Sequence, residues 1–213
     1  MKARPVLYVL AGVNGAGKSS VGGYLLERAG LTWFNPDTFA RELIAATGSD
    51  QRGANAQAWG EGMRRLDEAL ASGTSYAFET TLGGQSVPQK ILAATRSHDV
   101  LIWFCGLASP EQHIARVRAR VAAGGHDIPE AKIRERYVHA QGNLIRLMPH
   151  LAQVQVYDNS ADAPPGKAVP DPVLVLEMAK GKLLWPKPQD RAALHAAPEW
   201  AKALLEAALG MRR

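Results

Sequence analysis

The stretch from Gly12 to Ser19, GVNGAGKS, constrains the fold of this chain more than any other feature. Its spacing is GxxxxGK[ST], in which the glycines let successive backbone N–H groups face phosphates and the lysine neutralises phosphate oxygens. Such a loop belongs between a buried strand and the N-terminus of a helix, whose dipole favours an anion. The apolar run 5–13 therefore predicts a first strand, and we expect a helix from Lys18 to about Gly30.

The same apolar run follows a basic start and has a second interpretation, a secretory leader. Cleavage at the small residues that follow would remove the phosphate motif, so we favour the buried strand. The apolar runs all fall short of the ~20 residues that a membrane span needs. Cys105 is the only cysteine and lies in an apolar run, where it packs as a small hydrophobe. We expect a cytoplasmic protein with no membrane partner.

Apolar runs alternate with helical patterns along the rest of the chain, which is typical of a parallel sheet covered on both faces. We expect strands at 31–35, 75–82, 99–107 and 154–160, and helices at 37–48, 56–73, 87–97, 109–125 and 129–151. The predicted fold class is α/β, a three-layer sandwich of the P-loop kinase type. The last two helices form a hairpin lid, 109–152, whose glycine-rich turn 124–129 can move over the sheet.

A proline-rich connector at 161–172 follows the last of these strands. We therefore expect one main domain over 1–163 and a C-terminal extension over 164–213 that packs on it. The extension is predicted to contain a β-hairpin that turns at Lys180-Gly181 and a closing helix at 198–209.

The phosphate motif predicts that a nucleoside triphosphate binds with Mg²⁺, and it makes Ser19 the expected metal ligand. The reaction stays open between a small-molecule kinase, a switching or motor NTPase and a nucleic-acid-directed enzyme. Motor and switch proteins commonly end an apolar strand in an acid that holds the metal. The run 99–107 has no such acid, whereas the run 75–82 contains Glu79. The candidate nucleotide-binding residues are Gly12, Asn14, Gly15, Ala16, Gly17, Lys18, Ser19 and Ser20.

Polar side chains at the carboxyl ends of two predicted strands are candidates for the chemistry, because ligands bind at that edge of an open α/β sheet. Asp37 is a candidate base for a substrate hydroxyl, and its alternative role is the N-cap of the next helix. Glu79, Thr80 and Thr81 are candidate substrate contacts, with Glu79 also able to serve the metal through water. The threonines have an alternative role as turn formers.

Five arginines of the hairpin are candidates for stabilising charge on a transferred phosphoryl group, and the alternative is a solvated basic surface. His126, in the turn of the hairpin, is a candidate contact for phosphate or substrate, and otherwise a surface residue. The net charge of +5 and the pI of about 9.5 suit either polyphosphates or nucleic acid. No aromatic residues alternate with the basic clusters, so we consider nucleic acid unlikely as a partner. The arginines are Arg116, Arg118, Arg120, Arg134 and Arg136.

In order along the chain, the segments GVNGAGKSS, NPDTFAREL, FETTLGG, RVRARVAAGGHDIP and KIRERY resemble the zeta toxin family of P-loop kinases, over about residues 5–160. The resemblance implies an ATP- and Mg²⁺-dependent kinase that phosphorylates the 3′-hydroxyl of UDP-N-acetylglucosamine and that an antitoxin holds in check. It implies that Asp37 is the base, that Lys18 binds ATP and that Arg120 and Arg136 act on the transition state. The loop with Asp158 and Asn159 resembles the adenine-contacting segment of related kinases.

The substrate is left open, since another small hydroxyl compound, such as a nucleoside or an antibiotic, would use the same machinery. Two other functions are also left open. One is a nucleic-acid-dependent NTPase, and the other is a nucleotide-binding partner protein without catalysis.

Overall fold

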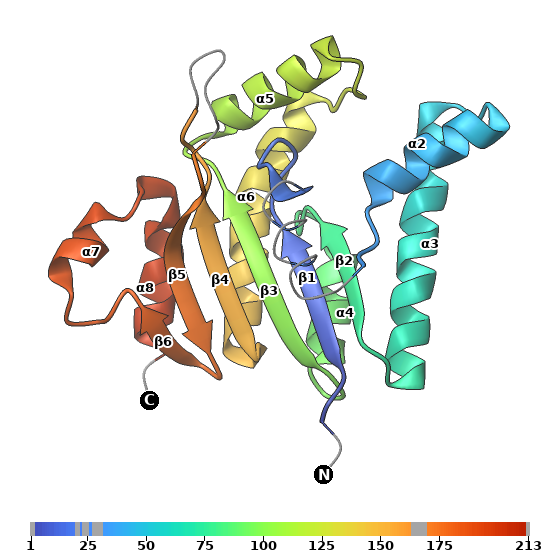
Figure 1. Cartoon of the computed structure of the whole chain (residues 1–213). Coiled ribbons are helices and arrows are strands. Elements are labelled where there is room, and N and C mark those ends of the chain that lie inside the picture. The colour runs from blue at the N-terminus through green and yellow to red at the C-terminus, as the bar shows by residue number, and fades with distance from the viewer. Residues whose placement is uncertain (1–2, 20–21, 23–25, 27–31, 163–169, 212–213) are drawn as a thin grey trace.

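Six strands form one sheet in the computed structural model of the chain, which describes residues 3–19, 22, 26, 32–162 and 170–211 (Figure 1). The spatial order is β2-β1-β3-β4-β5-β6. The first four strands pair in parallel, and β5 and β6 add an antiparallel edge. The bounds are β1 Val6–Ala11, β2 Tyr76–Thr80, β3 Asp99–Gly106, β4 Gln153–Asp158, β5 Val173–Ala179 and β6 Lys182–Trp185. The mixed α/β fold with a mainly parallel sheet confirms the predicted fold class.

Alternation along β1 divides its side chains between the two faces of the sheet. Leu7 and Val9 are fully buried in the main core, whereas Leu10 packs in a smaller cluster with Ala16 and Cys105. A run that is buried on both faces belongs in the middle of a parallel sheet, which is where β1 lies.

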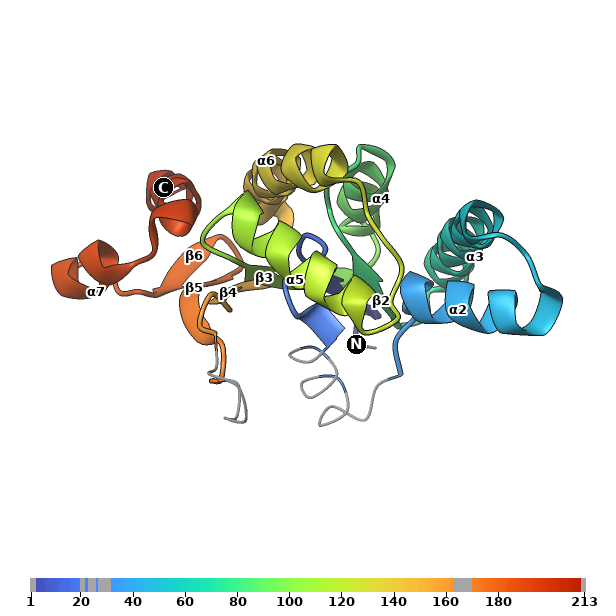
Figure 2. The same cartoon turned by 90° about the horizontal axis from the view of Figure 1, so that it is seen from above.

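Three helices cover the face of the main core (Figure 2). They are α4 Ser86–Ala94, α6 Glu130–Leu147 and α8 Lys202–Gly210. Ile91, Ile133 and Leu204, one from each helix, are all fully buried in the same cluster as Leu7. Helix α5 (Pro110–Ala122) lies over the carboxyl ends of the strands (Figure 1).

The other face carries the start of the helix predicted after the phosphate loop. Lys18, Ser19 and Gly22 are helical, and an added Cβ on Gly22 would meet Leu10 Cδ2 at 2.0 Å. Gly22 therefore lies directly against β1. The rest of this predicted helix, apart from the buried Leu26, lies outside the described residues, and so does Ser20.

A pair of helices, α2 Pro36–Thr47 and α3 Gln51–Ser72, stands beside β2. The predicted strand 31–35 is wrong in extent, because among the described residues it is a single bridge between Phe34 and Phe78. Pro36 has no N–H to donate and begins α2 at once, so pairing cannot continue. The helix predicted at 56–73 begins earlier, since the Asp50 carboxylate accepts the Gly53 N–H at 2.7 Å and caps the helix there.

The helix predicted at 129–151 ends at Leu147 and is followed by a 3₁₀ turn, Met148–His150. Pro149 cannot donate to the α-helical ladder, which accounts for the earlier end. Beyond residue 170, the chain forms the expected hairpin, with Lys180 and Gly181 at φ +48° and +72°. The short helix α7 Arg191–Ala196, the 3₁₀ turn Glu199–Ala201 and α8 follow.

The C-terminal strands and helix belong to the same core as the first strands. Leu176 of β5 and Leu204 of α8 are fully buried in the cluster that contains Leu7. Within the described ranges, no helix combines the length and the apolar character that crossing a membrane requires.

Candidate active site

The phosphate loop connects β1 to the helical turn that begins at Lys18, and its three glycines have positive φ. Gly12, Gly15 and Gly17 lie at φ +144°, +83° and +77°. A Cβ on Gly12 would stand 2.3 Å from the Cys105 carbonyl oxygen. Glycine is therefore required at position 12 for two reasons, the backbone angle and the close approach of β3.

Two side chains from distant segments hold the backbone of this loop. Nδ1 of His113, on α5, bonds to the Asn14 carbonyl oxygen at 2.8 Å, and the Asn159 amide donates to the Ala16 carbonyl oxygen at 2.9 Å. Burial lowers the pKa of His113 to about 4, more than its bond to Asn14 raises it. The imidazole is therefore neutral near pH 7, and Nδ1 carries the proton because a carbonyl oxygen can only accept.

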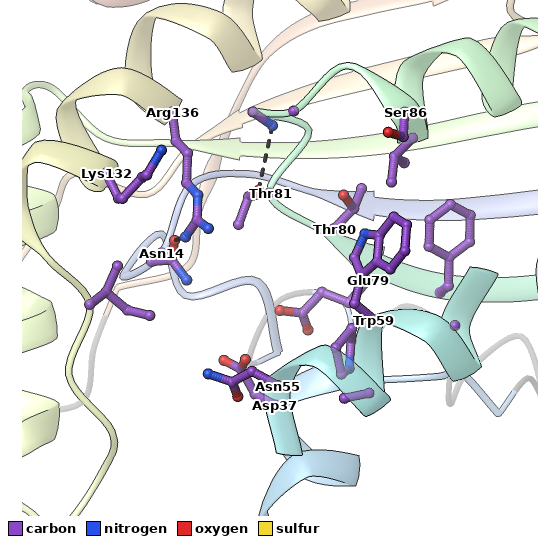
Figure 3. A pocket seen from close by; sticks show the side chains of 18 of the residues that line it. Asn14, Asp37, Asn55, Trp59, Glu79, Thr80, Thr81, Ser86, Lys132 and Arg136 are labelled. Carbon is purple, nitrogen blue, oxygen red and sulfur yellow. Dashed lines mark hydrogen bonds between the residues drawn. The ribbon is translucent and has the colours of Figure 1, made fainter. Parts of the chain in front are cut away.

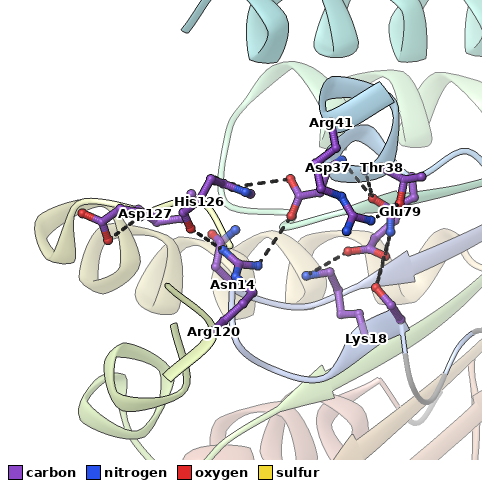
Figure 4. A network of polar contacts seen from close by, with 12 residues as sticks. Asn14, Lys18, Asp37, Thr38, Arg41, Glu79, Arg120, His126 and Asp127 are labelled. Carbon is purple, nitrogen blue, oxygen red and sulfur yellow. Dashed lines mark hydrogen bonds and ion pairs between the residues drawn. The ribbon is translucent and has the colours of Figure 1, made fainter. Parts of the chain in front are cut away.

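A buried polar network lies beside the loop (Figure 4). Lys18 Nζ is 3.3 Å from Glu79 Oε1, and Ser19 Oγ donates to Glu79 Oε2 at 3.1 Å. The Asn35 amide donates to Glu79 Oε2 at 3.0 Å. Lys18 and Glu79 are 7% and 9% exposed, so each charge depends on the other in this low-dielectric setting. Glu79 therefore lies against the nucleotide-binding side chains as well as the pocket wall.

Asp37 lies at the start of α2, but it does not cap the helix. The N-cap is Asn35, whose Oδ1 accepts the N–H groups of Asp37 and Thr38 at 2.9 and 3.1 Å. The Asp37 carboxylate instead faces Arg120 Nη1 at 3.7 Å and His126 Nε2 at 3.8 Å (Figure 4). The N-cap alternative for Asp37 is thus wrong, because Pro36 occupies the first helical position and moves the cap to Asn35.

Arg136, on α6, faces the phosphate loop from the other side. Its Nη1 donates to Asn14 Oδ1 at 2.7 Å, and burial lowers its pKa without removing its charge. A Cβ on Gly83 would come within 2.6 Å of Arg136 Cγ, so the loop after β2 packs tightly on this arginine.

That loop is fixed from behind by α6. Leu82 is buried at φ +56°, which is strained for a residue with a side chain. The fully buried Asn143 amide donates to the carbonyl oxygens of Leu82 at 2.7 Å and Gly84 at 2.9 Å. Thr80 and Thr81 accept the N–H groups of Leu82 and Gly83 through Oγ1. Both threonines therefore shape the turn while their side chains also line the pocket.

The other three arginines pair away from the pocket. Arg116 binds Asp162, with Nη2 to Oδ1 at 2.7 Å, and so ties α5 to the loop after β4. Arg118 pairs with Glu130, and Arg134 pairs with Glu111 at 2.6 Å. The structure thus separates Arg120 and Arg136, which reach the site, from their three neighbours.

A pocket of about 430 Å³ opens between the phosphate loop, α3 and α6 (Figure 3). It contains most of the polar residues described above and reaches the aromatic residue Trp59 on α3. Its charged lining residues are Lys18, Asp37, Glu79, Lys132, Glu135 and Arg136, with His126 beside them.

The residues present fit a nucleotide with Mg²⁺. The glycine cradle leaves room for phosphates, and Arg120 Nε is buried without a partner among the described residues, as a donor awaiting an anion would be. Mg²⁺ binds through one or two protein oxygens plus phosphates and water, and Ser19 and Glu79 supply such oxygens side by side. The described ranges hold no group of three or more His, Cys, Asp or Glu residues able to bind a metal without the nucleotide.

Sequence reasoning missed four residues that the structure brings to the site: Asn35, Trp59, His113 and Asn143. Asn35 could have been found, because an asparagine before a proline at a helix start is a typical N-cap. Nothing local marks the other three, whose contacts join segments far apart in the chain.

A curated relative from Haemophilus influenzae, described as an uncharacterized protein, is 26% identical over 138 residues, covering 64% of this chain and 94% of that protein. The crystal structure of AvrRxo1-ORF1:-ORF2 with ATP is similar in fold, with a TM-score of 0.62 at 16% identity, covering 97% of this chain. The chain spans 64% of the length of that structure. The PezAT chromosomal toxin-antitoxin system of Streptococcus pneumoniae matches with a TM-score of 0.55 at 16% identity, over 74% of this chain and 68% of that one.

The sequence also matches a family model, AAA_33, described as an AAA domain, over residues 7–138. The match includes the phosphate loop, Asp37, Glu79 and both arginines that reach the site, and it covers more than half of the chain. The chain therefore belongs to the AAA_33 family of P-loop domains.

Proposed function

We propose that this protein is an ATP- and Mg²⁺-dependent phosphotransferase that moves the γ-phosphoryl group of ATP to a hydroxyl of a small molecule. One observation carries the proposal: the Asp37 carboxylate lines a pocket beside the phosphate loop, with Arg136 in the same lining and Arg120 Nη1 at 3.7 Å from that carboxylate. A protein that only hydrolyses ATP has no need of such a pocket, whereas a kinase needs both a base and a place for the acceptor.

Each of these residues has its own role in the proposed reaction. The loop from Gly12 to Ser19 binds the phosphates, and Lys18 exchanges Glu79 for phosphate oxygens. Asp37 accepts the proton of the acceptor hydroxyl as its oxygen bonds to the γ-phosphorus. The bond from that phosphorus to the bridging oxygen breaks, and ADP leaves. Arg120 and Arg136 stabilise the charge on the transferred group, as arginines do in phosphoryl transfer.

Ser19 and Glu79 would hold Mg²⁺ together with the phosphates, and the ion neutralises charge that develops on the phosphate oxygens. Asn159 holds the loop through its bond to the Ala16 carbonyl oxygen, and from the resemblance we propose that the adenine lies beside it. Thr80, Thr81 and His126 line the pocket and are our proposed acceptor contacts.

For the acceptor we propose UDP-N-acetylglucosamine first, on the basis of the resemblance to the zeta toxin family. A nucleoside or an antibiotic hydroxyl is the alternative. An antitoxin is a possible partner on the same basis, and the cytoplasm is the proposed location.

The test is incubation with ATP, Mg²⁺ and a metabolite mixture that contains UDP-N-acetylglucosamine, followed by mass spectrometry for one added phosphate. We expect Lys18→Ala and Asp37→Asn to lower transfer at least about a hundredfold. Glu206→Gln removes an exposed carboxylate from α8, remote from the site, and should leave transfer unchanged.

Two results would count against the proposal. If Asp37→Asn kept near-normal transfer, Asp37 would not be the base. If RNA or DNA stimulated ATP hydrolysis in a salt-sensitive way while no compound gained a phosphate, a nucleic-acid-dependent NTPase would replace the kinase.

A further inference from the structure

The pocket beside the phosphate loop has a charged half and an uncharged half. The charged side chains come from the phosphate loop, the start of α2, the end of β2 and α6. The uncharged half is built by α3 and the start of α4, and Figure 3 shows Trp59 and Ser86 across the pocket from Lys132 and Arg136. Its residues are Asn55, Ala58, Trp59, Gly62, Met63, Gln85, Ser86 and Val87.

All the charged groups of this half except Arg136 have an oppositely charged partner, and Arg136 donates to the neutral Asn14 side chain. Lys18 pairs with Glu79, Asp37 faces Arg120 and His126, and Lys132 pairs with Glu135. Lys18, Asp37 and Glu79 already have roles in the proposed phosphate transfer and metal binding, so we expect the uncharged half to recognise the remaining part of the acceptor.

Trp59 differs from its helix neighbours because its indole is not part of the hydrophobic core. Its neighbours Ala54, Ala58 and Gly62 form the buried stripe of α3, while Trp59 is 55% exposed. The indole N–H groups of Trp103, Trp185 and Trp200 all donate hydrogen bonds, whereas that of Trp59 and the buried indole N–H of Trp33 make none among the described residues. An exposed aromatic face in a pocket wall is suited to stacking on a ring.

The polar residues around Trp59 indicate which kind of ligand ring would fit there. Asn55 receives a hydrogen bond from Gln51 on its Oδ1 at 2.9 Å, so its amide nitrogen can still donate. Gln85 and Ser86 add donors and acceptors, and no carboxylate or ammonium belongs to this wall. Amide and hydroxyl groups beside an aromatic face match an uncharged ring that carries hydroxyl, carbonyl or amide groups.

We infer that the α3 wall is a ring-binding subsite, in which an uncharged ring of the acceptor stacks on Trp59 and bonds to Asn55 and Gln85. The inference rests on the proposed phosphotransferase function and assigns the residues that select its acceptor. It predicts acceptance of compounds with a neutral ring and rejection of open-chain, charged polyols.

Binding is measured first, without turnover, on protein with ¹⁵N-labelled tryptophan in the presence of ADP and Mg²⁺. Of the five indole N–H signals, those of Trp59 and Trp185 are assigned through Trp59→Phe and Trp185→Phe. UDP-N-acetylglucosamine, uridine and gluconate are added in turn. We expect a saturable shift of the Trp59 signal with at least one ring compound, no shift with gluconate, and a constant Trp185 signal on β6.

Steady-state kinetics then test whether Trp59 contributes to the choice of acceptor. Trp59→Ala should raise the KM for the ring acceptor about tenfold or more, as loss of an aromatic stack does, with kcat changed much less. Trp59→Phe should restore most of the loss because it keeps an aromatic face, and Trp185→Phe should match the wild type. The affinity for ADP should stay the same in all three variants.

The two proposals fail in different ways. A Trp59 shift by a ring compound that is never phosphorylated supports the subsite and overturns the kinase. Phosphate transfer with an unmoved Trp59 signal and an unchanged KM in Trp59→Ala overturns the subsite and keeps the kinase. Preferred transfer to gluconate, or no shift with either ring compound, also overturns the subsite.

Discussion

The backbone of the phosphate loop and the polar side chains around it are held by different kinds of contact. The phosphate loop is fixed by bonds to its own backbone, from His113 to the Asn14 carbonyl and from Asn159 to the Ala16 carbonyl. The polar side chains around the loop are held by charged pairs, Lys18 with Glu79 and Asp37 with Arg120 and His126. A phosphate oxygen can take the place of a carboxylate partner at Lys18 or Arg120, whereas the bonds to the Asn14 and Ala16 carbonyls are buried within the protein. The site thus combines a rigid cradle with groups that substrates can engage.

The largest expected effect comes from breaking the rigid cradle at Gly12. Gly12→Ala places a Cβ at 2.3 Å from the Cys105 carbonyl oxygen, at φ +144°. We expect a loss of roughly 4 kcal/mol in the free energy of unfolding, from strain and overpacking together. Denaturant titration measures it. Gly142→Ala is the control, because that helical position has no atom within 4 Å of the added Cβ and should gain stability. Equal behaviour of the two variants would contradict the rigid cradle.

The next largest effect is a pH dependence of the free energy of unfolding, which arises from His113. The pKa of His113 is about 4 in the folded protein and 6.5 in the unfolded chain. The unfolded chain therefore binds the extra proton between these values, so stability falls as the pH drops from 6.5 to 4. The full cost is roughly 3 kcal/mol.

His113→Gln keeps a donor for the Asn14 carbonyl but does not titrate, so its stability should fall less over this range. Denaturation at several pH values gives the difference between the two proteins. Parallel curves for the wild type and His113→Gln would mean that the imidazole is not held neutral by burial.

A smaller change in free energy, seen in the rate of phosphate transfer, is expected for the side-chain pair of Asp37 and Arg120. Arg120→Ala should lower phosphate transfer about a hundredfold, or ~2.7 kcal/mol in the barrier, and change stability little. Arg118→Ala is the matched control on the same helix, because Arg118 pairs with Glu130 at the surface. Its loss should cost at most about 0.5 kcal/mol in stability and leave transfer within about twofold. Similar kinetic losses in both variants would mean a general effect of positive charge.

Local patterns in the sequence predict the cradle and the order of most elements. The glycine spacing, the apolar strands and the cap at Ser109, which accepts the Gln112 N–H at 3.2 Å, all appear in the structure. The predicted strand at 31–35 failed because the proline that follows it starts a helix, a local signal that outweighed the apolar run. The same proline explains why Asn35, and not Asp37, caps α2.

The sequence could not separate the five arginines by local reasoning. Their spacing puts Arg116 and Arg120 on one helix face, yet Arg116 binds Asp162 whereas Arg120 faces Asp37. Only the positions of α2 and the loop after β4 decide this. The same holds for the bond between His113 and Asn14, which joins residues that are 99 positions apart.

The position of β4 beside β3 has a consequence for where the chain can be cut. The match to the family model ends at residue 138, inside α6 and before β4. A fragment ending there would leave β3 as an open sheet edge, with buried residues such as Val100 and Phe104 uncovered, and such edges promote aggregation. It would also lack Asn159 and the bond from Trp200 to Asp158 at 2.9 Å, which anchors the last helical segment to the nucleotide end of the site. A fragment cut at residue 138 therefore lacks strands and contacts that complete the sheet and the site in the structure.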